Sequence, residues 1–423
     1  MKRHNIYLLV LVPWLAFGAE PDLAECQPRG GLPNVFSKLK RAEPVRIGYL
    51  GGSITAQEGW RVKTLEWFQH QYPKAQVTEI NAAIGGTGSD LGVFRLRHDV
   101  LEHQPDLLFV EFAVNDAGAA PDRIYRSMEG IVRQTWRDHP ATDICFVYTI
   151  AGNMLETLKE GRLPRSYTAM DKIAAHYDIP SINLGLEVAR LEKEGKLVFK
   201  RAKPKTKKDK DALAGKILFS PDGVHPYPDT GHQVYLETIV RSLGPIQAAG
   251  KPAPHVLPNP YVSDHWEAAK MIPLSRLQPG HGWQQLDPAT NHLAKDFGPR
   301  MGQLWKAGQP GTTLEFKFRG TAAGIYDLLG PDCGQLLVSL DGQKPSLQPR
   351  FDAYCTYHRL AMLTIASGLS NTVHTVRLEI HPDQPDKAKI LSQRQEKMDD
   401  PKRFDGRAWY AGAVMLLGDL VEP

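Results

Sequence analysis

Short apolar runs and longer amphipathic stretches alternate along residues 45–245. We predict strands at the apolar runs, which lie at 45–50, 77–83, 106–113, 144–150 and 179–184. Helices are expected between and after them, at 58–72, 88–103, 122–138, 164–178 and 229–243. Strands that are apolar on both faces and separated by helices are typical of a parallel sheet that is covered on both sides. With right-handed crossovers, the pattern predicts an α/β fold, a three-layer α/β/α sandwich of flavodoxin-like type, over residues 40–245.

The pattern changes after residue 245. Glycine and proline are frequent in residues 246–262, which predicts a linker. Alternating apolar runs follow at 313–318, 323–329, 336–340, 373–380 and 409–417. One of them ends in Asp341-Gly342, a dipeptide that is typical of a tight hairpin turn. We therefore predict a β-sandwich accessory domain over residues 263–423.

The first 19 residues have the pattern of an export signal. Lys2, Arg3 and His4 precede an apolar run at 6–17, which is too short to span a bilayer, and small residues follow it. A buried N-terminal strand is the alternative. No later segment has 18 uninterrupted apolar residues, so no membrane span is expected. The prediction is an exported protein, periplasmic or extracellular.

Charge is nearly balanced, with 51 Lys and Arg against 47 Asp and Glu. Residues 200–211 hold seven of the basic residues and only two acidic ones, so this segment carries +5 and the rest of the chain −1. A nucleic-acid-binding protein spreads basic residues over a face of its fold, so no nucleic-acid partner is expected. The basic segment is predicted to be a solvated loop.

Four cysteines in an exported protein permit disulfides without requiring them. Cys145 lies in an apolar run and is expected to be a buried free thiol. Cys333 and Cys355 are the expected disulfide pair, and the alternative is that both stay reduced. Cys26 could be unpaired.

Candidate chemistry begins at Ser53, which follows two glycines at the end of the first predicted strand. Ligands of open α/β sheets bind at the carboxyl ends of the strands, but a serine nucleophile also needs a base. Asp222 and His225 lie three residues apart between two prolines, so the carboxylate can hold one imidazole nitrogen while the other faces a serine. Thr55 stands where a Gly-x-Ser-x-Gly elbow would have its second glycine, which argues against the α/β-hydrolase fold.

Two further segments can supply hydrogen-bond donors to an oxyanion. Gly86, or its neighbour Gly85, follows the second strand and can present a bare backbone N–H. Asn115 follows the third strand and can donate from its side chain, and the backbone N–H of Ser53 would be a further donor.

These four blocks, in this order, resemble the SGNH or GDSL-type hydrolase superfamily. The resemblance covers about residues 45–243 and implies Ser53 as nucleophile, Asp222 and His225 as its partners, and Gly86 and Asn115 as oxyanion donors. It implies hydrolysis of esters without a cofactor. There are two departures: Gly-Gly-Ser-Ile replaces Gly-Asp-Ser-Leu, and an alanine stands where the Gly-x-Asn-Asp block has glycine.

Other chemistries find less support. Residues 86–92 approach a dinucleotide-binding fingerprint, but the spacing is one residue too long and the segment follows the second strand rather than the first. The sequence contains neither His-Glu-x-x-His nor Cys-x-x-Cys, so no metal centre is predicted. We expect His232 on a helix surface or in packing, and Trp60 is a candidate wall of the substrate pocket.

The substrate follows from the resemblance alone. Exported members with an attached β-sandwich are often carbohydrate esterases, and residues 316–342 resemble the jelly-roll domain of such enzymes. Removal of O-acetyl groups from a glycan is therefore the leading expectation. The alternatives are a lipase or lysophospholipase, an aryl esterase, a glycan O-acetyltransferase, and a glycan-binding protein with a vestigial esterase.

Overall fold

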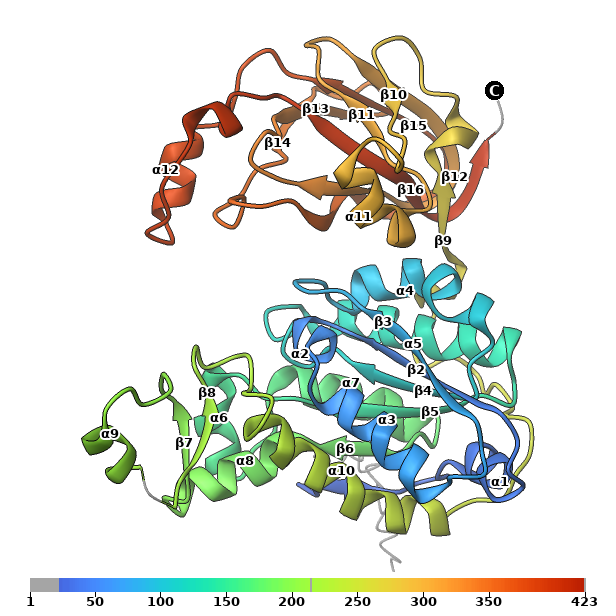
Figure 1. Ribbon diagram of the computed structural model, residues 1–423. Coiled ribbons are helices and arrows are strands. Elements are labelled where there is room, and N and C mark those ends of the chain that lie inside the picture. The colour runs from blue at the N-terminus through green and yellow to red at the C-terminus, as the bar shows by residue number, and fades with distance from the viewer. Residues whose placement is uncertain (1–22, 214, 422–423) are drawn as a thin grey trace, which may run out of the picture.

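The computed structural model describes residues 23–213 and 215–421, so the export signal predicted at residues 1–19 lies outside them. The chain forms two domains, the N-terminal one drawn in blue to green and the C-terminal one in yellow to red (Figure 1). Of the helices in these described ranges, none combines the length and apolar character needed to cross a membrane.

The N-terminal domain is built on a six-stranded sheet in the order β1-β6-β5-β4-β2-β3. Five strands are parallel, and the short β1 is antiparallel to β6. The strands are β1 (Cys26–Gln27), β2 (Val45–Gly51), β3 (Val77–Ala83), β4 (Leu107–Glu111), β5 (Asp143–Tyr148) and β6 (Ser181–Asn183). All five predicted strands are present. The central strands β4 and β5 are buried along their whole length, whereas β3, at the edge of the sheet, exposes Thr78 and Glu79.

Helices cover both faces of this sheet, which confirms the predicted three-layer architecture. On one face α3 (Trp60–Gln71), α8 (Leu184–Lys193) and α10 (Gly231–Ala248) lie side by side, with α1 (Pro33–Lys40) packed on α3. On the other face α5 (Pro121–Asp138) lies between α4 (Ser89–Asp99) and α7 (Arg165–His176). The shorter helices are α2 (Ser53–Ala56), η1 (Leu101–His103) and α6 (Gly152–Lys159).

A small parallel pair projects from the side of this domain (Figure 1). It consists of β7 (Leu197–Lys200) and β8 (Ile217–Ser220), and α9 (Lys207–Asp211) lies in the connection between them. Strand β8 runs directly into the loop that carries Asp222 and His225.

Residues 249–265 lie against the N-terminal domain. Helix α10 continues to Ala248, so the first residues of the predicted linker are helical. The buried carboxylate of Glu129 on α5 accepts hydrogen bonds from the backbone N–H groups of Tyr261 (2.5 Å) and Val262 (2.9 Å). The ring of His255 stacks on that of Trp136 at 4.4 Å. These contacts fix the segment on the surface of α5.

The C-terminal domain is one antiparallel sheet of eight strands, in the order β10-β11-β16-β12-β15-β13-β14 with β9 beside β16. The strands are β9 (Ala269–Pro273), β10 (Gln284–Gln285), β11 (Trp305–Ala307), β12 (Thr313–Leu329), β13 (Gln335–Leu340), β14 (Ser346–Pro349), β15 (Arg359–Ile380) and β16 (Trp409–Val421). The helices are η2 (Trp266–Ala268), η3 (Leu274–Leu277), α11 (His292–Met301), α12 (Lys387–Ser392) and η4 (Pro401–Phe404).

The sheet of the C-terminal domain curls around its own core. The register of β12 shifts between Gly320 and Ala322 against both β15 and β16, and such bulges bend strands. Phe318, before the shift, and Ile325, after it, are buried in the same apolar cluster. The predicted β-sandwich is therefore found as two halves of a single curled sheet that share long, bent strands.

The outer face of the curled sheet joins the core of the N-terminal domain. Tyr326 of β12 and Met415 of β16 belong to the same buried cluster as the residues of α4. Trp266 lies between the domains, with its ring 5.9 Å from that of Phe94, and Arg123 lies over it at 5.8 Å. The two domains thus share one continuous apolar core.

The predicted disulfide is wrong, because the structure holds Cys333 and Cys355 as free thiols. Each thiol has its own acceptor: Cys333 donates to the carbonyl of Leu328, and Cys355 donates to the carboxylate of Asp352. They are buried in different apolar clusters. Cys145 is a buried free thiol, as predicted.

Candidate functional site

Ser53 is the first residue of α2 and follows directly on the end of β2. The two glycines before it are required by close packing. A Cβ atom on Gly52 would lie 1.9 Å from Oδ1 of Asn115, and one on Gly51 would lie 2.6 Å from Oγ1 of Thr55. The sharp turn from strand to helix therefore places Ser53 at the carboxyl edge of the sheet, beside the side chain of Asn115.

The structure brings Ser53, His225 and Asp222 together from both ends of the domain. Nε2 of His225 is 2.9 Å from Oγ of Ser53, and Nδ1 is 2.7 Å from Oδ2 of Asp222. These distances allow one hydrogen-bonded chain from the carboxylate through the imidazole to the hydroxyl. The side chain of His225 is 35% exposed, so substrate and water can reach it.

The carboxylate of Asp222 is held in its ionised form. Partial burial opposes ionisation, but hydrogen bonds from the His225 ring, from the backbone N–H groups of His225 and Val224, and from the Ser220 hydroxyl hold its pKa well below the usual range. The loop thus orients the carboxylate and keeps it charged opposite the imidazole. An ionised Asp222 makes Nδ1 of His225 the protonated nitrogen and leaves Nε2 free to accept from Ser53.

The glycine segment after β3 also lies beside Ser53. A Cβ atom on Gly85 would lie 3.6 Å from Cβ of Ser53, whereas one on Gly86 would meet nothing within 4 Å. Gly86 adopts a φ of +73°, a left-handed conformation that favours glycine. Gly85 is therefore the nearer neighbour of Ser53, and Gly86 makes the turn.

Glu111, the last residue of β4, is a site residue that the sequence reasoning missed. Its carboxylate accepts from the hydroxyls of Thr55 (2.8 Å) and Thr149 (2.6 Å), and from the backbone N–H groups of Gly52 and Ala113. Burial raises its pKa despite these hydrogen bonds. One buried carboxylate therefore ties the turn that carries Ser53 to the turn that leads to Asn115. An acidic residue inside an otherwise apolar strand was the available signal.

Asp116 ties the same region to the glycine segment. Its Oδ1 accepts from the backbone N–H of Ser89 at 3.1 Å, at the start of α4. A Cβ atom on Gly88 would lie 2.3 Å from this oxygen, so the approach requires glycine. Burial raises the pKa of Asp116 to about 7.

Trp60 does not line the site, which corrects the prediction of a pocket wall. It is fully buried, with its ring 5.5 Å from that of Tyr49 and 5.9 Å from that of Phe109, because it faces the sheet. His232 is buried in packing: Nδ1 accepts from the backbone N–H of Trp60, and Nε2 donates to Gln57. Burial lowers the pKa of His232 to about 3, so it is neutral.

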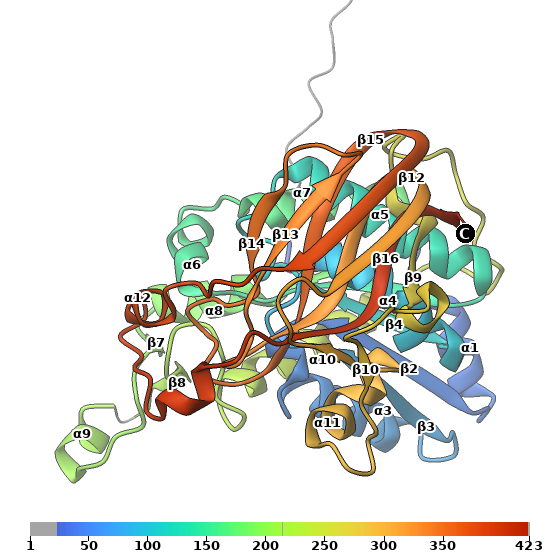
Figure 2. The same cartoon turned by 90° about the horizontal axis from the view of Figure 1, so that it is seen from above.

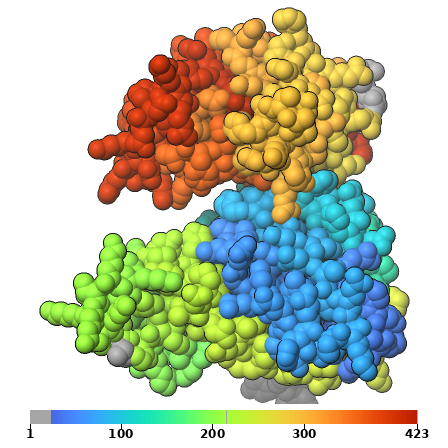
Figure 3. All heavy atoms as spheres, viewed as in Figure 1, coloured from blue at the N-terminus to red at the C-terminus, as the bar shows by residue number. Residues whose placement is uncertain are grey.

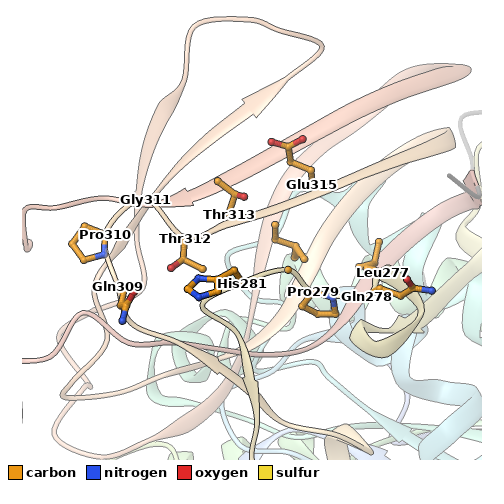
Figure 4. A pocket seen from close by; sticks show the side chains of 12 residues that line it. Leu277, Gln278, Pro279, His281, Gln309, Pro310, Gly311, Thr312, Thr313 and Glu315 are labelled. Carbon is orange, nitrogen blue, oxygen red and sulfur yellow. The ribbon is translucent and has the colours of Figure 1, made fainter.

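Two other polar features lie in the C-terminal domain and include none of these residues. Residues 277–281 and 309–315 line a depression of about 600 Å³, where Figure 4 shows the side chains of His281, Thr312 and Glu315. Within the described parts of the chain, the one group of three metal-ligating side chains is Asp332, Cys333 and His358. Nε2 of His358 is 2.7 Å from Oδ1 of Asp332, so these two already pair with each other.

Comparison with known proteins finds a family model that matches the part of the chain that holds the site. A model of the GDSL-like lipase/acylhydrolase family matches residues 49–234. Among curated proteins, none matches the sequence. Two solved structures of a two-domain esterase (CEX) active on acetylated mannans, one co-crystallized with mannopentaose, cover 93% of this chain and 97% of their own length. They are 19% identical to it, with TM-scores of 0.69 for the mannopentaose structure and 0.70 for the other, so the likeness is one of fold across both domains.

Proposed function

We propose that this protein is an ester hydrolase that removes O-acetyl groups from a polysaccharide, since residues 49–234 match a model of the GDSL-like lipase/acylhydrolase family. The hydrogen-bonded chain from Asp222 through His225 to Ser53 carries the proposal. A serine at the carboxyl edge of the sheet, with a base already in hydrogen-bond distance, has the arrangement that acyl transfer requires.

The first half of the reaction forms an acetyl-serine. Oγ of Ser53 attacks the acetyl carbonyl carbon while Nε2 of His225 takes the hydroxyl proton, and ionised Asp222 stabilises the imidazolium. The tetrahedral intermediate then collapses, His225 gives the proton to the departing sugar oxygen, and the sugar leaves with a free hydroxyl.

Water completes the reaction by the same route. It loses a proton to His225 as it attacks the acetyl-serine, and the second tetrahedral intermediate releases acetate and restores the serine hydroxyl. Every proton passes through His225, so no cofactor enters the scheme.

The negative oxygen of each intermediate would be stabilised by donors that surround Ser53. The side chain of Asn115 lies against Gly52, and the glycine segment lies next to Ser53. We assign the donors as the Asn115 amide, the backbone N–H of Ser53 and a backbone N–H of Gly85 or Gly86. Removal of one such donor costs about 2.7–4 kcal/mol of transition-state stabilisation.

Two observations favour a short acyl group on a glycan over a long-chain lipid. The two-domain fold is shared, over nearly the whole length, with an esterase active on acetylated mannans. Among the described residues, none of the exposed large apolar side chains comes from the segments that carry Ser53, Gly85, Asn115 and His225. The exposed ones are Leu23, Val256, Tyr261, Leu347, Tyr354, Tyr357 and Val373. A lipase would be expected to expose such side chains around its nucleophile. We also propose that the enzyme is exported and acts outside the cytoplasm, where polysaccharides accumulate.

The test is acetate release from acetylated polysaccharides, together with hydrolysis of p-nitrophenyl esters of increasing chain length. We expect acetate release, a preference for the two-carbon ester, and loss of both activities in Ser53→Ala without loss of folding. The control is Ser370→Ala, which changes an exposed serine of the C-terminal domain and should leave both activities unchanged. If Ser53→Ala keeps kcat within tenfold of the parent, Ser53 is not the nucleophile. A preference for long-chain esters would refute the deacetylase proposal.

A further inference from the structure

The basic segment, residues 200–211, adjoins the loop that carries His225. The backbone N–H of Arg201 donates to the carbonyl of Ser220 at 2.9 Å, and the hydroxyl of Tyr227 donates to the carbonyl of Arg201 at 3.1 Å. Nζ of Lys203 lies 5.2 Å from the centre of the Tyr227 ring. The base of the segment is thus attached to both sides of the candidate catalytic loop, within a few residues of His225.

The charge of the segment is largely uncompensated. Its seven cationic side chains face two carboxylates, and one of these, Asp209, already accepts from Thr206 at 2.7 Å and lies 3.5 Å from Arg201. Five lysines are exposed and have no ion-pair partner among the described residues; they are Lys200, Lys205, Lys207, Lys208 and Lys210. Holding so many like charges together costs free energy, so an anionic partner would stabilise the segment.

The segment projects sideways from the N-terminal domain (Figure 1). Helix α12 and the pair β7–β8 with α9 extend on the same side of the molecule (Figures 1 and 2). The space-filling view shows an open hollow between the green residues of the segment and the orange to red residues of the C-terminal domain (Figure 3). Residues 387–403, which include α12, hold five basic residues outside the buried Lys387, against three acidic ones. A long polymer lying in this hollow would pass between two walls of net positive charge.

We propose that the basic segment binds the carboxylate groups of an acidic polysaccharide, and that acetylated, uronate-containing glycans are the preferred polymers of this enzyme. This inference rests on the proposed deacetylase function and names its substrate class. A glycan fits better than a nucleic acid, because the charge of the chain outside this segment is −1. A polymeric glycan also fits the position of the segment. The segment adjoins the loop that carries His225, so its cationic side chains can hold the polymer beside the ester that is hydrolysed.

Electrostatic attraction of this kind predicts a dependence on salt. A cleft lined by charges of one sign raises the local concentration of an oppositely charged substrate by about 10–10³-fold. The Debye length falls from about 30 Å at 0.01 M to about 3 Å at 1 M ionic strength, so the attraction weakens as salt is added. A neutral glycan gains nothing from the charge, and its deacetylation should not respond to salt in this way.

The experiment compares acetylated polygalacturonate with acetylated mannan of matched acetyl content, at low and high salt. We expect a higher kcat/KM on polygalacturonate at low salt and a loss of that preference at high salt. The test variant is Lys205→Gln/Lys207→Gln/Lys208→Gln/Lys210→Gln, which should lower the ratio of the two rates about tenfold. The matched control replaces four exposed lysines elsewhere, Lys74→Gln/Lys251→Gln/Lys295→Gln/Lys344→Gln, and should leave the ratio unchanged.

A binding measurement separates this inference from the deacetylase proposal. Ser53→Ala, which performs no chemistry, is tested by affinity electrophoresis in gels that contain unacetylated polygalacturonate or mannan. Retardation by polygalacturonate alone, abolished by the four test substitutions, supports the inference even if no polymer is deacetylated. Equal retardation by both polymers, or deacetylation of both with one rate and one salt response, overturns it. Binding to vesicles that contain anionic lipid is measured as well. If the four test substitutions abolish binding to vesicles and change binding to neither polymer, the inference is overturned and the segment is assigned to a membrane surface.

Discussion

Removal of the C-terminal domain is predicted to destabilise the N-terminal domain, because the two domains share one apolar core. Trp266 lies between them, in contact with Phe94 of α4 and beneath the guanidinium of Arg123. Tyr326 and Met415 of the curled sheet are buried in the same cluster. Truncation would expose this face of α4 to water.

The size of the effect follows from the side chains that the interface buries. Phe94, Trp266, Tyr326 and Met415 are each no more than 8% exposed. Complete burial of one such side chain contributes about 1.5–3 kcal/mol, so the four together contribute about 6–12 kcal/mol at most. A whole domain is stable by about 5–15 kcal/mol. The interface is therefore comparable in free energy to the stability of either domain, and the two should unfold together.

The assay is differential scanning calorimetry of the full chain, of a chain that ends after Ser263, and of Trp266→Ala. The truncation keeps the segment that is bound to Glu129, so it removes the interface alone. We expect one transition in the full chain and a lower unfolding temperature, with aggregation, in the truncated chain. Trp266→Ala should lose about 3–5 kcal/mol of unfolding free energy. Tyr357→Ala, at a residue that is 56% exposed, is the control and should leave the unfolding temperature unchanged.

One result would refute this reasoning. If the truncated chain is soluble, unfolds at the temperature of the full chain and keeps its full rate on p-nitrophenyl acetate, the interface does not stabilise the catalytic domain. The C-terminal domain would then serve to hold the polymer near Ser53, and its removal would lower only the rate on polysaccharide.

Three substitutions test the site, and one labelling experiment tests the thiols of the C-terminal domain. Asn115→Ala should lower kcat about 10²–10³-fold with KM nearly unchanged, because the donor acts on charge that develops in the transition state; an effect confined to KM in steady-state kinetics would make Asn115 a binding residue. Glu111→Gln should lower kcat and stability together, because an amide cannot accept all four hydrogen bonds that the carboxylate accepts; an unchanged melting temperature would contradict this. Burial raises the pKa of Asp116 to about 7, so the folded chain binds more protons than the unfolded chain, and stability should fall as pH rises from about 4 to 7. Thermal unfolding across this pH range should show a smaller dependence on pH for Asp116→Asn. An equal dependence in both proteins would refute the assignment. Cys333 and Cys355 should both react with iodoacetamide in denaturant without reductant, whereas protection of both in the mass spectrum would restore the disulfide.

Much of the N-terminal domain could be predicted from the sequence, because its signals are local. A parallel strand that is buried on both faces is a largely apolar run, and β2, β4 and β5 are such runs. The carboxyl ends of parallel strands meet at one edge of the sheet, so residues that follow different strands lie close together. That rule associated Ser53 with Asn115. Asp222 and His225 follow β8, which belongs to a separate two-stranded sheet, and their assignment rested on their spacing and on the family resemblance.

The tertiary structure decided what depends on the direction of a side chain. Trp60 is near Ser53 in sequence, but its helix directs the ring into the sheet rather than toward the nucleophile. Glu111 accepts from Thr55 and Thr149, which come from separate elements, so no spacing in the sequence could reveal its role. The same holds for Trp266, whose packing between the domains arises only when the curled sheet meets α4.

The physical reason is the range of the interactions involved. Hydrophobic periodicity and turn preferences act over a few residues and appear directly in the sequence. A buried carboxylate or thiol is satisfied by whichever donors and acceptors the fold brings within about 3 Å, and these come from distant positions. Cys333 and Cys355 illustrate this, since their spacing permitted a bond while the fold gave each thiol an acceptor of its own.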